Sequence, residues 1–373
     1  MIDCKQCNEE MKYNPISILK SVENKQSKAR RLKKDRERAL EWAMPNIKHL
    51  DLLPLTKEEL DQIDEVWGAL GMKPYPLFYQ LFKTTDNFNP LYLSDDLYYP
   101  IIVRTLNPRQ YSTAFSHKGH LPMLFGDIKQ PSLICLCNGG VCYNSDFEIV
   151  DKKSIVSLLL SKESFIIKPT TNTSGGNGVR LVTDGHNEDI QTLIEGYGDN
   201  WIVQEPVEQS EITMQFNPSS LNTFRFTTLF LNGKVTTQSI IFKTGSVGSV
   251  VDNLSAGGVL VGVGASGELR EYGVNKKYCK CEKTASGILL RGCKINEVPT
   301  MAKQMEYYHR RYFPSLGIVG WDVAMDKNNQ PVVIEANLVF PGILFEQLAI
   351  STPIFGDRTE EVIQFVLEKK GKA

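Results

Sequence analysis

The sequence predicts an α+β fold in which antiparallel sheets follow a mostly helical N-terminal region. Residues 1–115 carry helical spacing of apolar side chains and many aromatic residues, whereas short strands alternate with helices from residue 116 onward. Residues 212–272 consist almost entirely of strand and turn patterns. We therefore expect three parts: the helical region and two α+β subdomains over residues 116–207 and 208–373.

The composition is that of a large globular protein. Its 373 residues, 42% of them hydrophobic, are enough for a sizeable core and two or three subdomains. A net charge of −1 argues against general electrostatic binding to nucleic acid. No apolar run approaches the roughly 20 residues that span a bilayer, and the N-terminus lacks a signal-sequence pattern. We expect a cytoplasmic protein.

The eight cysteines fit that expectation. Cys4 and Cys7 form a CxxC motif, but no second pair follows at zinc-site spacing, and the remaining cysteines lie within residues 135–142 and 279–293. Reduced, structural thiols are the expected reading in a reducing compartment. A zinc site built across these groups is the alternative.

The N-terminal region begins with a predicted helix over residues 16–43. It carries a cationic block, Lys28–Arg38, in which two acidic residues dilute the charge. This block predicts a solvated helix face, with contact to acidic membrane lipid or nucleic acid as the alternative. A second helix is expected after Thr56, because Thr56 and Glu59 have the spacing of a capping box.

The later elements follow from apolar runs and their flanking turn residues. The expected strands and helices are, in order, Leu133–Cys137, the helix Lys153–Leu160, Phe165–Lys168, Gly178–Val182, the helix Glu188–Tyr197, Trp201–Glu205, and the helices Thr300–Tyr312 and Thr359–Glu368. We expect antiparallel sheets that carry helices on one side.

A hairpin is predicted within Gly317–Gly342. Two apolar runs flank the polar stretch Asp326–Pro331. Asn328 and Asn329 can supply the left-handed backbone that a two-residue hairpin turn requires. The two runs should therefore pair across these asparagines.

In that pairing, three oxygen-bearing side chains share one face of the hairpin. Asp322 lies opposite Glu335, and Asn337 lies two residues further along the same strand. Two facing carboxylates repel each other, whereas Mg²⁺ or Ca²⁺ prefers such oxygen ligands. The hairpin therefore predicts a metal site; an exposed hairpin with its acids in water is the alternative.

A lysine and a glycine-rich loop suggest a phosphate site. Lys168 ends the apolar strand Phe165–Pro169, where a lysine is unusual unless an anion meets it. The following stretch, Thr170–Gly178, can bring backbone N–H groups against phosphate oxygens. It lacks the Gly-Lys-Ser/Thr ending of a P-loop, and an ordinary hairpin loop is the alternative.

Three further segments have a possible binding role. Trp201–Val207 runs into a proline, which leaves backbone groups free to pair with an adenine edge. Arg225 begins an apolar strand and could clamp phosphate or carboxylate; a surface salt bridge is the alternative. Gly262–Gly267 matches the dinucleotide-binding pattern, but no helical run follows, so we expect a strand–turn–strand there.

Taken in order, these motifs resemble the sugar-transfer-associated ATP-grasp family. The resemblance covers roughly residues 95–350 and rests on an ordered set: His117-Lys118, IIKP with TNTSGGNGV, VQEPV, NTFR, VVDNLSAGG, GWDVAMD and VVIEANLVFPG. It implies that ATP lies between two α+β subdomains. It also implies an ATP-dependent, ADP-forming ligase.

The resemblance implies roles for residues that would hold ATP. Lys118 and Lys168 resemble the two lysines that reach the phosphates, and Glu211 occupies the position of an acid for the ribose hydroxyls. The remaining implied contacts are the lid residues Ser174, Gly175 and Gly176 within Thr173–Gly178, and the adenine segment Gln204, Glu205, Pro206 and Val207.

The resemblance also implies a catalytic centre. Asp322, Glu335 and Asn337 match ligands that usually hold two Mg²⁺ ions, with Mn²⁺ as an alternative. Gly320 stands where many ATP-grasp ligases carry an arginine, so Arg225 or Lys243 must supply that charge. The residues implied near the γ-phosphate are Arg225, Lys243, Asp252 and Asn253.

The implied chemistry is carboxylate activation through an acyl phosphate, followed by attack of an amine to form an amide. The small-molecule substrates would be an amino acid or, from the family's name, a sugar acid in cell-surface polysaccharide biosynthesis. A phosphotransferase acting on a hydroxyl and a non-catalytic ATP-binding module are alternatives. We expect substrate-selecting residues within 1–115 and Lys276–Pro299, where no motif stands out.

Overall fold

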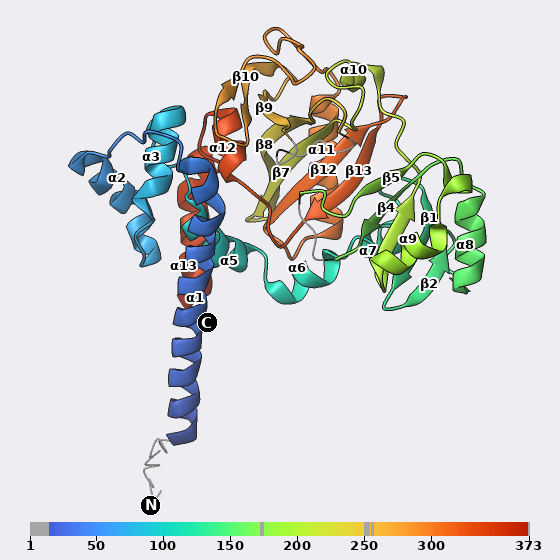
Figure 1. The fold of residues 1–373 in the computed structure, drawn as a ribbon. Coiled ribbons are helices and arrows are strands. Elements are labelled where there is room, and N and C mark those ends of the chain that lie inside the picture. Colours follow the sequence, from blue (N-terminus) through green and yellow to red (C-terminus); the bar gives the residue numbers. More distant parts are fainter. Residues whose placement is uncertain (1–14, 172–174, 250–253, 255–256, 372–373) are drawn as a thin grey trace, which may run out of the picture.

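The computed structural model describes residues 15–171, 175–249, 254 and 257–371. A helical region lies at one end, a seven-stranded sheet in the middle and a six-stranded sheet at the other end (Figure 1). All strand pairs within the two sheets are antiparallel. The predicted α+β class is confirmed.

The helical region precedes both sheets. Its elements are α1 (Pro15–Ile47), α2 (Lys57–Trp67), η1 (Gly68–Leu70), α3 (Pro76–Thr85), α4 (Asp95–Leu97), the π-helix η2 (Tyr98–Val103), α5 (Arg104–Leu106), α6 (Arg109–Phe115) and α7 (His120–Leu124). The capping box before α2 is confirmed, because Thr56 Oγ1 accepts from the Glu59 N–H and Glu59 accepts from the Thr56 N–H. Within the described residues, no helix combines the length and apolar character needed to cross a bilayer.

The cationic block of α1 is partly used inside the protein. Arg36 donates to Asp96 at 2.6 Å, and the acidic Asp35 pairs with Arg104 at 2.6 Å. Lys33 and Lys34 remain exposed to solvent. The block therefore fastens α1 to the rest of the helical region while its other charges face water.

The six-stranded sheet has the strand order β3-β2-β1-β6-β4-β5. Its strands are β1 (Leu133–Asn138), β2 (Val141–Asn144), β3 (Ile149–Val150), β4 (Phe165–Pro169), β5 (Arg180–Val182) and β6 (Asn200–Gln204). Helices α8 (Lys152–Leu160) and α9 (Ile190–Tyr197) pack on one face with the short η3 (Gly185–Asn187) nearby. Cys135, Cys137 and Cys142 are buried free thiols in this core, whereas Cys4 and Cys7 lie outside the described residues.

The seven-stranded sheet has the order β11-β10-β9-β8-β7-β12-β13. Its strands are β7 (Thr223–Leu231), β8 (Lys234–Thr244), β9 (Val259–Val263), β10 (Leu269–Asn275), β11 (Lys280–Cys281), β12 (Ile318–Met325) and β13 (Pro331–Asn337). The turn from β9 to β10 is the predicted strand–turn–strand. Helix α10 (Glu211–Met214) lies in the connection that leads into β7.

The seven-stranded sheet carries helices on both faces, not on one side as the sequence suggested. Helix α11 (Val298–Tyr312) packs with Ile240 and Trp321, whereas α12 (Leu344–Ile350) packs with Ile241 and Ile318 in a separate core. Alternating strand residues are apolar on both faces, because this sheet is central in the molecule. The second core continues into the helical region through η5 (Gly356–Arg358) and α13 (Thr359–Gly371).

The predicted hairpin forms, but its turn differs from the prediction. The turn has three residues, Lys327–Asn329, closed by the Asp326 N–H donating to the Gln330 carbonyl at 3.0 Å. Asn329 alone adopts the left-handed backbone, with φ of 59°. The prediction of a two-residue turn at Asn328 and Asn329 is therefore wrong.

A bulge restores the predicted register next to the turn. Val323 pairs with Val333, whereas Asp322 pairs with Glu335, which leaves Ile334 as an extra residue in β13. The additional residue in the turn and the additional residue in the bulge offset each other. Asp322 therefore lies opposite Glu335, and Gly320 opposite Asn337, as predicted.

A buried asparagine joins the helical region to this hairpin. The Asn107 side chain donates to the Ile318 and Leu338 carbonyls at 2.7 Å each. It accepts from the Gly317 and Ile318 N–H groups at 3.0 Å each. Both donors and both acceptor positions of the Asn107 side chain are thus used to bind the backbone at the start of β12 and just after the end of β13.

We expect Asn107→Ala to lower the free energy of unfolding by about 2–4 kcal/mol, because it leaves several buried backbone groups without partners. Urea denaturation followed by circular dichroism measures this loss. Asn187→Ala is the control, since the Asn187 amide bonds the exposed Asp184. Equal stability of the two variants would contradict the structural role of Asn107.

Candidate active site

Asp322 lies at the centre of a group of charges on β12. Arg225, on the neighbouring strand β7, donates to both Asp322 oxygens at 2.7 and 2.9 Å. Lys243, at the end of β8, lies 3.0 Å from Asp322 Oδ1. The structure thus brings the predicted Arg225 and Lys243 onto one predicted metal ligand, and all three side chains are largely buried.

These cations control the charge state of Asp322. Burial alone would raise the pKa of Asp322, but the charges of Arg225 and Lys243 outweigh it and hold the pKa well below its usual range. Burial likewise opposes the charge of Arg225, while Asp322 and Glu346 raise the pKa of Arg225. The carboxylate and the guanidinium therefore stay ionised together in a buried place.

Glu335 and Asn337 are residues of β13, and they lie beside Asp322 of β12. The Asn337 amide nitrogen lies 3.3 Å from Asp322 Oδ2 and 3.3 Å from Glu335 Oε1. Lys118, in the turn before α7, lies 3.1 Å from Glu335 Oε2. The two carboxylates therefore converge on one point, as the sequence predicted.

Lys168 reaches the same place from the six-stranded sheet. Its neighbour Ile167 packs in the core with α8 and α9, so Lys168 points to the opposite face. Burial lowers the pKa of Lys168 to about 8; the Lys118 charge also lowers it, and the Glu335 charge raises it. Lys168 is therefore a buried cation that lies within electrostatic range of Lys118 and Glu335.

The glycine-rich loop follows Lys168 directly. Gly175, Gly176 and Gly178 all adopt left-handed backbone, with φ of 65°, 71° and 75°. The Lys118 N–H donates to the Thr170 carbonyl at 3.0 Å, so the start of the loop is fixed beside Lys118. Ser174, Asp252 and Asn253 lie outside the described residues.

The predicted adenine segment leaves the sheet after β6. Gln204 is buried and pairs with Ile166, two residues before Lys168 on the neighbouring strand. The Glu205 side chain is exposed and pairs with Lys162 at 3.3 Å, and Pro206 and Val207 are half-buried. The segment is thus beside the strand that carries Lys168.

Glu211 lies apart from the charged group. It begins α10, where the preceding Ser210 bonds Asn329 at 2.5 Å and Met325 at 2.9 Å. These contacts place Glu211 at the turn end of the hairpin, with its side chain exposed.

The position of Gly320 explains how Arg225 reaches Asp322. A Cβ on Gly320 would lie 3.4 Å from both Cδ and Nη1 of Arg225 and 3.4 Å from Pro341. The Arg225 side chain therefore lies across the surface of Gly320. The guanidinium from β7 fills the space next to the strand position where the resemblance implied an arginine.

Glu346 is a buried acid that the sequence did not reveal. It lies in the first turn of α12. Its carboxylate accepts hydrogen bonds from Thr227 at 2.7 Å and from Ser239 at 2.6 Å, and it lies 3.5 Å from Arg225. Burial raises the pKa of Glu346, while Arg225 and the two hydroxyls oppose that shift. Thr227 lies two residues after Arg225, on the same face of β7. This polar residue in an apolar strand was the one sequence feature that could have indicated a buried polar partner such as Glu346.

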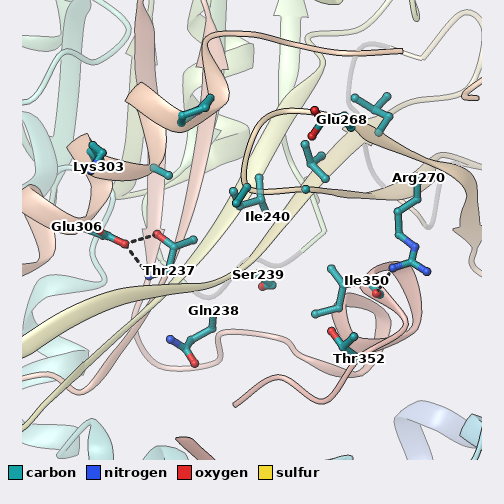
Figure 2. Close-up of a pocket in the computed structure, with 16 residues that line it drawn as sticks. Thr237, Gln238, Ser239, Ile240, Glu268, Arg270, Lys303, Glu306, Ile350 and Thr352 are labelled. Atoms are coloured by element: carbon teal, nitrogen blue, oxygen red, sulfur yellow. Dashed lines mark hydrogen bonds between the residues drawn. The ribbon is translucent and has the colours of Figure 1, made fainter. Parts of the chain in front are cut away.

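A separate pocket of about 720 Å³ lies between α11 and the end of α12 (Figure 2). It forms where β9 stops pairing with β8, next to Thr237–Ile240. Ser239 lines this pocket and also bonds Glu346. None of the predicted site residues lines it.

The residues on β12 and β13 fit a hard cation. Two converging carboxylates and an amide are the oxygen donors that Mg²⁺ accepts. Among the described residues, no group of three or more histidine, cysteine or acidic side chains forms another candidate metal site. Asp322, Glu335 and Asn337 offer side chains of this kind on one face of the hairpin.

The family model of sugar-transfer associated ATP-grasp proteins matches residues 102–362, which is more than half of the sequence. The chain belongs to the sugar-transfer associated ATP-grasp family. No curated protein matches it at a significant level.

Several solved structures are similar to this chain. D-alanyl-alanine synthetase A from Vibrio cholerae shares 14% identity over 69% of this chain and 66% of its own, with a TM-score of 0.42. The ATP-grasp ligase PsnB, complexed with a minimal precursor, Mg and ADP, shares 12% identity over 70% and 62%, with a TM-score of 0.40. D-cycloserine synthetase DcsG shares 14% identity over 71% and 73%, with a TM-score of 0.40. The chain thus spans just under two thirds of the length of the first two.

We expect Asp322→Asn to lower the free energy of unfolding by about 3–5 kcal/mol, because Arg225 and Lys243 would lose their buried counter-charge. Glu335→Gln should cost only about 1 kcal/mol, since the Glu335 side chain is 28% exposed and its ion pair with Lys118 is within reach of solvent. Urea denaturation at pH 7 compares the two. Equal losses would contradict the central position of Asp322.

Proposed function

We propose that this protein is an ATP- and Mg²⁺-dependent carboxylate–amine ligase that forms an amide through an acyl phosphate. The supporting observation is the convergence of Arg225, Lys243 and Lys118 on the carboxylates of Asp322 and Glu335. Such a site suits phosphoryl transfer, which depends on positioning and on neutralising charge. Membership of the ATP-grasp family supports the same reaction class.

In this proposal the two sheets hold ATP between them. Lys118 and Lys168 bind phosphate oxygens, and the glycine-rich loop covers the triphosphate. The backbone of Gln204–Val207 pairs with adenine, and Glu211 contacts the ribose. The proposed boundaries are residues 116–207 for the first subdomain and 208–373 for the second.

Asp322, Glu335 and Asn337 would hold Mg²⁺, with two ions as the proposed number and Mn²⁺ as a substitute. Bound Mg²⁺ supplies positive charge to the triphosphate. Arg225 then orients the transferred phosphoryl group, and Lys243 adds a second cation near it. Asn253 is proposed to act beside them.

The reaction has two steps. A substrate carboxylate oxygen forms a bond to the γ-phosphorus, and the bond from that phosphorus to the β–γ bridging oxygen breaks, which releases ADP. The amine nitrogen then forms a bond to the acyl carbon, and the carbon–oxygen bond to phosphate breaks. The amine loses a proton, and inorganic phosphate leaves.

The proposed carboxylate is an amino acid or a sugar acid of a cell-surface polysaccharide. The family's description as sugar-transfer associated supports the second choice.

A product assay tests the function. The full chain is incubated with ATP, Mg²⁺ and hydroxylamine against a panel of amino acids and uronic acids, and both ADP and hydroxamate are measured. A hydroxamate formed together with ADP supports the ligase, because hydroxylamine traps an acyl phosphate. A stable phosphorylated product without hydroxamate would show a phosphotransferase, and ATP binding without ADP release would show a non-catalytic module.

We expect Glu335→Gln to abolish Mg²⁺-dependent ADP release, because it removes one of two carboxylates proposed to hold the metal. Circular dichroism should show a folded protein, and a titration with Mg²⁺ should show weakened binding. Full turnover in this variant would remove Glu335 from the metal site. Glu188→Gln is a matched control, since Glu188 pairs with the exposed Arg180.

We expect Lys168→Ala to weaken ATP binding at least tenfold at pH 7, because it removes a buried charge from the proposed phosphate site. Wild-type affinity should fall as pH rises through about 8, where Lys168 loses its proton. Lys168→Arg should flatten this dependence, since a guanidinium stays charged. Isothermal titration calorimetry measures each dissociation constant, with exposed Lys57→Ala as the control.

An unchanged dissociation constant in Lys168→Ala would contradict the assignment. A wild-type affinity that is flat between pH 7 and pH 9 would show that Lys168 does not titrate in this range.

A further inference from the structure

The Arg225 guanidinium lies between two buried carboxylates that come from different parts of the fold. Its Nε and Nη2 donate to the two oxygens of Asp322 at 2.7 and 2.9 Å. Its third nitrogen, Nη1, lies 3.5 Å from Glu346 Oε1, in the first turn of α12. Arg225 therefore bridges a proposed metal ligand on β12 and a helical acid to which the proposed mechanism gives no role.

Two hydroxyl groups hold Glu346 in this position. Thr227 and Ser239 are directly opposite each other on β7 and β8, and both donate to Glu346 Oε2, at 2.7 and 2.6 Å. Arg225 lies two residues before Thr227, so its side chain is on the same face of β7. The register of two strands thus fixes one oxygen of Glu346, while the other oxygen is the one nearer to Arg225.

That second oxygen, Glu346 Oε1, is buried and has no hydrogen-bond partner among the described residues. Its separation from Arg225 Nη1, 3.5 Å, exceeds the roughly 2.7–3.2 Å of an N–H···O hydrogen bond. Leaving a buried acceptor unpaired is costly. A shift of Arg225 toward α12 by about half an ångström would complete the bond.

Asp322, in contrast, has donors on both of its oxygens. Oδ1 accepts from Arg225 and lies 3.0 Å from Lys243 Nζ, and Oδ2 accepts from Arg225 and lies 3.3 Å from the Asn337 amide nitrogen. A carboxylate has about four acceptor positions, so these contacts fill them. Asp322 can therefore bind Mg²⁺ only if Arg225 loosens its hold, and a buried guanidinium then needs another counter-charge.

We propose that Glu346 is a positioning residue that becomes the counter-charge of Arg225 when Asp322 binds Mg²⁺. In this exchange Arg225 moves from Asp322 toward Glu346 Oε1, and its Nε and Nη2 become free to meet the transferred phosphoryl group. Without Glu346, Arg225 would stay on Asp322 and compete with the metal for it. The inference rests on the proposed function, because it explains how Asp322 and Arg225 serve the same reaction.

Nucleotide binding with and without metal tests the proposal without relying on turnover. Isothermal titration calorimetry measures the ADP dissociation constant of the full chain in EDTA and in excess Mg²⁺, and the ratio of the first to the second reports how strongly Mg²⁺ supports binding. We expect Glu346→Gln to reduce this ratio at least fivefold. ADP binding in EDTA should be as tight as in the wild type or tighter, because the variant removes a negative charge near an anionic ligand.

This split separates positioning from a structural role, because a damaged fold would weaken ADP binding in both conditions. Asp96→Asn is the matched control. Asp96 is also a buried carboxylate that accepts twice from one arginine, Arg36, at 3.0 and 2.6 Å, but it lies in the helical region. Its variant should lose stability and keep the wild-type ratio.

A double variant shows whether Glu346 acts through Arg225. Arg225→Gln removes the guanidinium, so adding Glu346→Gln to that variant should change the ratio less than twofold. An equal effect of Glu346→Gln in both backgrounds would mean that its charge acts on the metal directly, and this result would overturn the positioning role.

The wild-type protein offers a test that needs no variant. In a crystal structure with ADP and Mg²⁺, we expect Arg225 Nη1 to lie within about 3.2 Å of Glu346 Oε1 and the double contact of Arg225 with Asp322 to be broken. Mg²⁺ on Asp322 while Arg225 keeps both contacts with Asp322 would overturn the proposal, even where the variants fail to fold.

Failure of the proposed function gives a different result. If Mg²⁺ does not strengthen ADP binding to the wild type, and no hydroxamate forms in the product assay, the ligase proposal is wrong and the role of Glu346 falls with it. If the wild type shows both, and Glu346→Gln keeps the wild-type ratio, only the role of Glu346 is wrong.

Discussion

Charge neutrality around one buried carboxylate constrains the whole site. Asp322 lies on a strand whose residues are all buried, where an ionised acid is stable only beside cations. Arg225 and Lys243 supply them from the two strands beyond β12 in the sheet order, and Gly320 leaves the surface over which Arg225 extends. The opposite sheet adds Lys168, and the turn before α7 adds Lys118. These four cations outnumber the carboxylates of Asp322, Glu335 and Glu346, which suits the anionic ligand that we propose.

The hairpin shows why the sequence predicted the register of Asp322 and Glu335 better than it predicted the turn and the bulge. Alternation of apolar residues placed Asp322, Glu335 and Asn337 on one face, and the observed register agrees. The predicted turn was one residue too short, and the bulge at Ile334 offset that error. A bulge leaves little trace in a pattern of period two, because Val332, Val333 and Ile334 are all apolar.

Glu346 was beyond the reach of sequence patterns for a different reason. The hydroxyls that it bonds come from distant parts of the chain, and those contacts depend on strand register and on how α12 packs against the sheet. Lys118 and Lys168 were accessible because each stands in a short motif of the family. The fold class likewise followed from local periodicity, whereas the placement of α11 and α12 on opposite faces required the tertiary structure.

The last helix of the chain shares a core with the first helices. Val362 and Val366 of α13 lie in the same cluster as Ala39, Trp67 and Leu97, and Lys370 bonds the Leu70 carbonyl at 3.0 Å. During synthesis, the N-terminal helices therefore keep part of their apolar surface uncovered until α13 has been made. A chain that stops before α13 would be prone to aggregation for this reason.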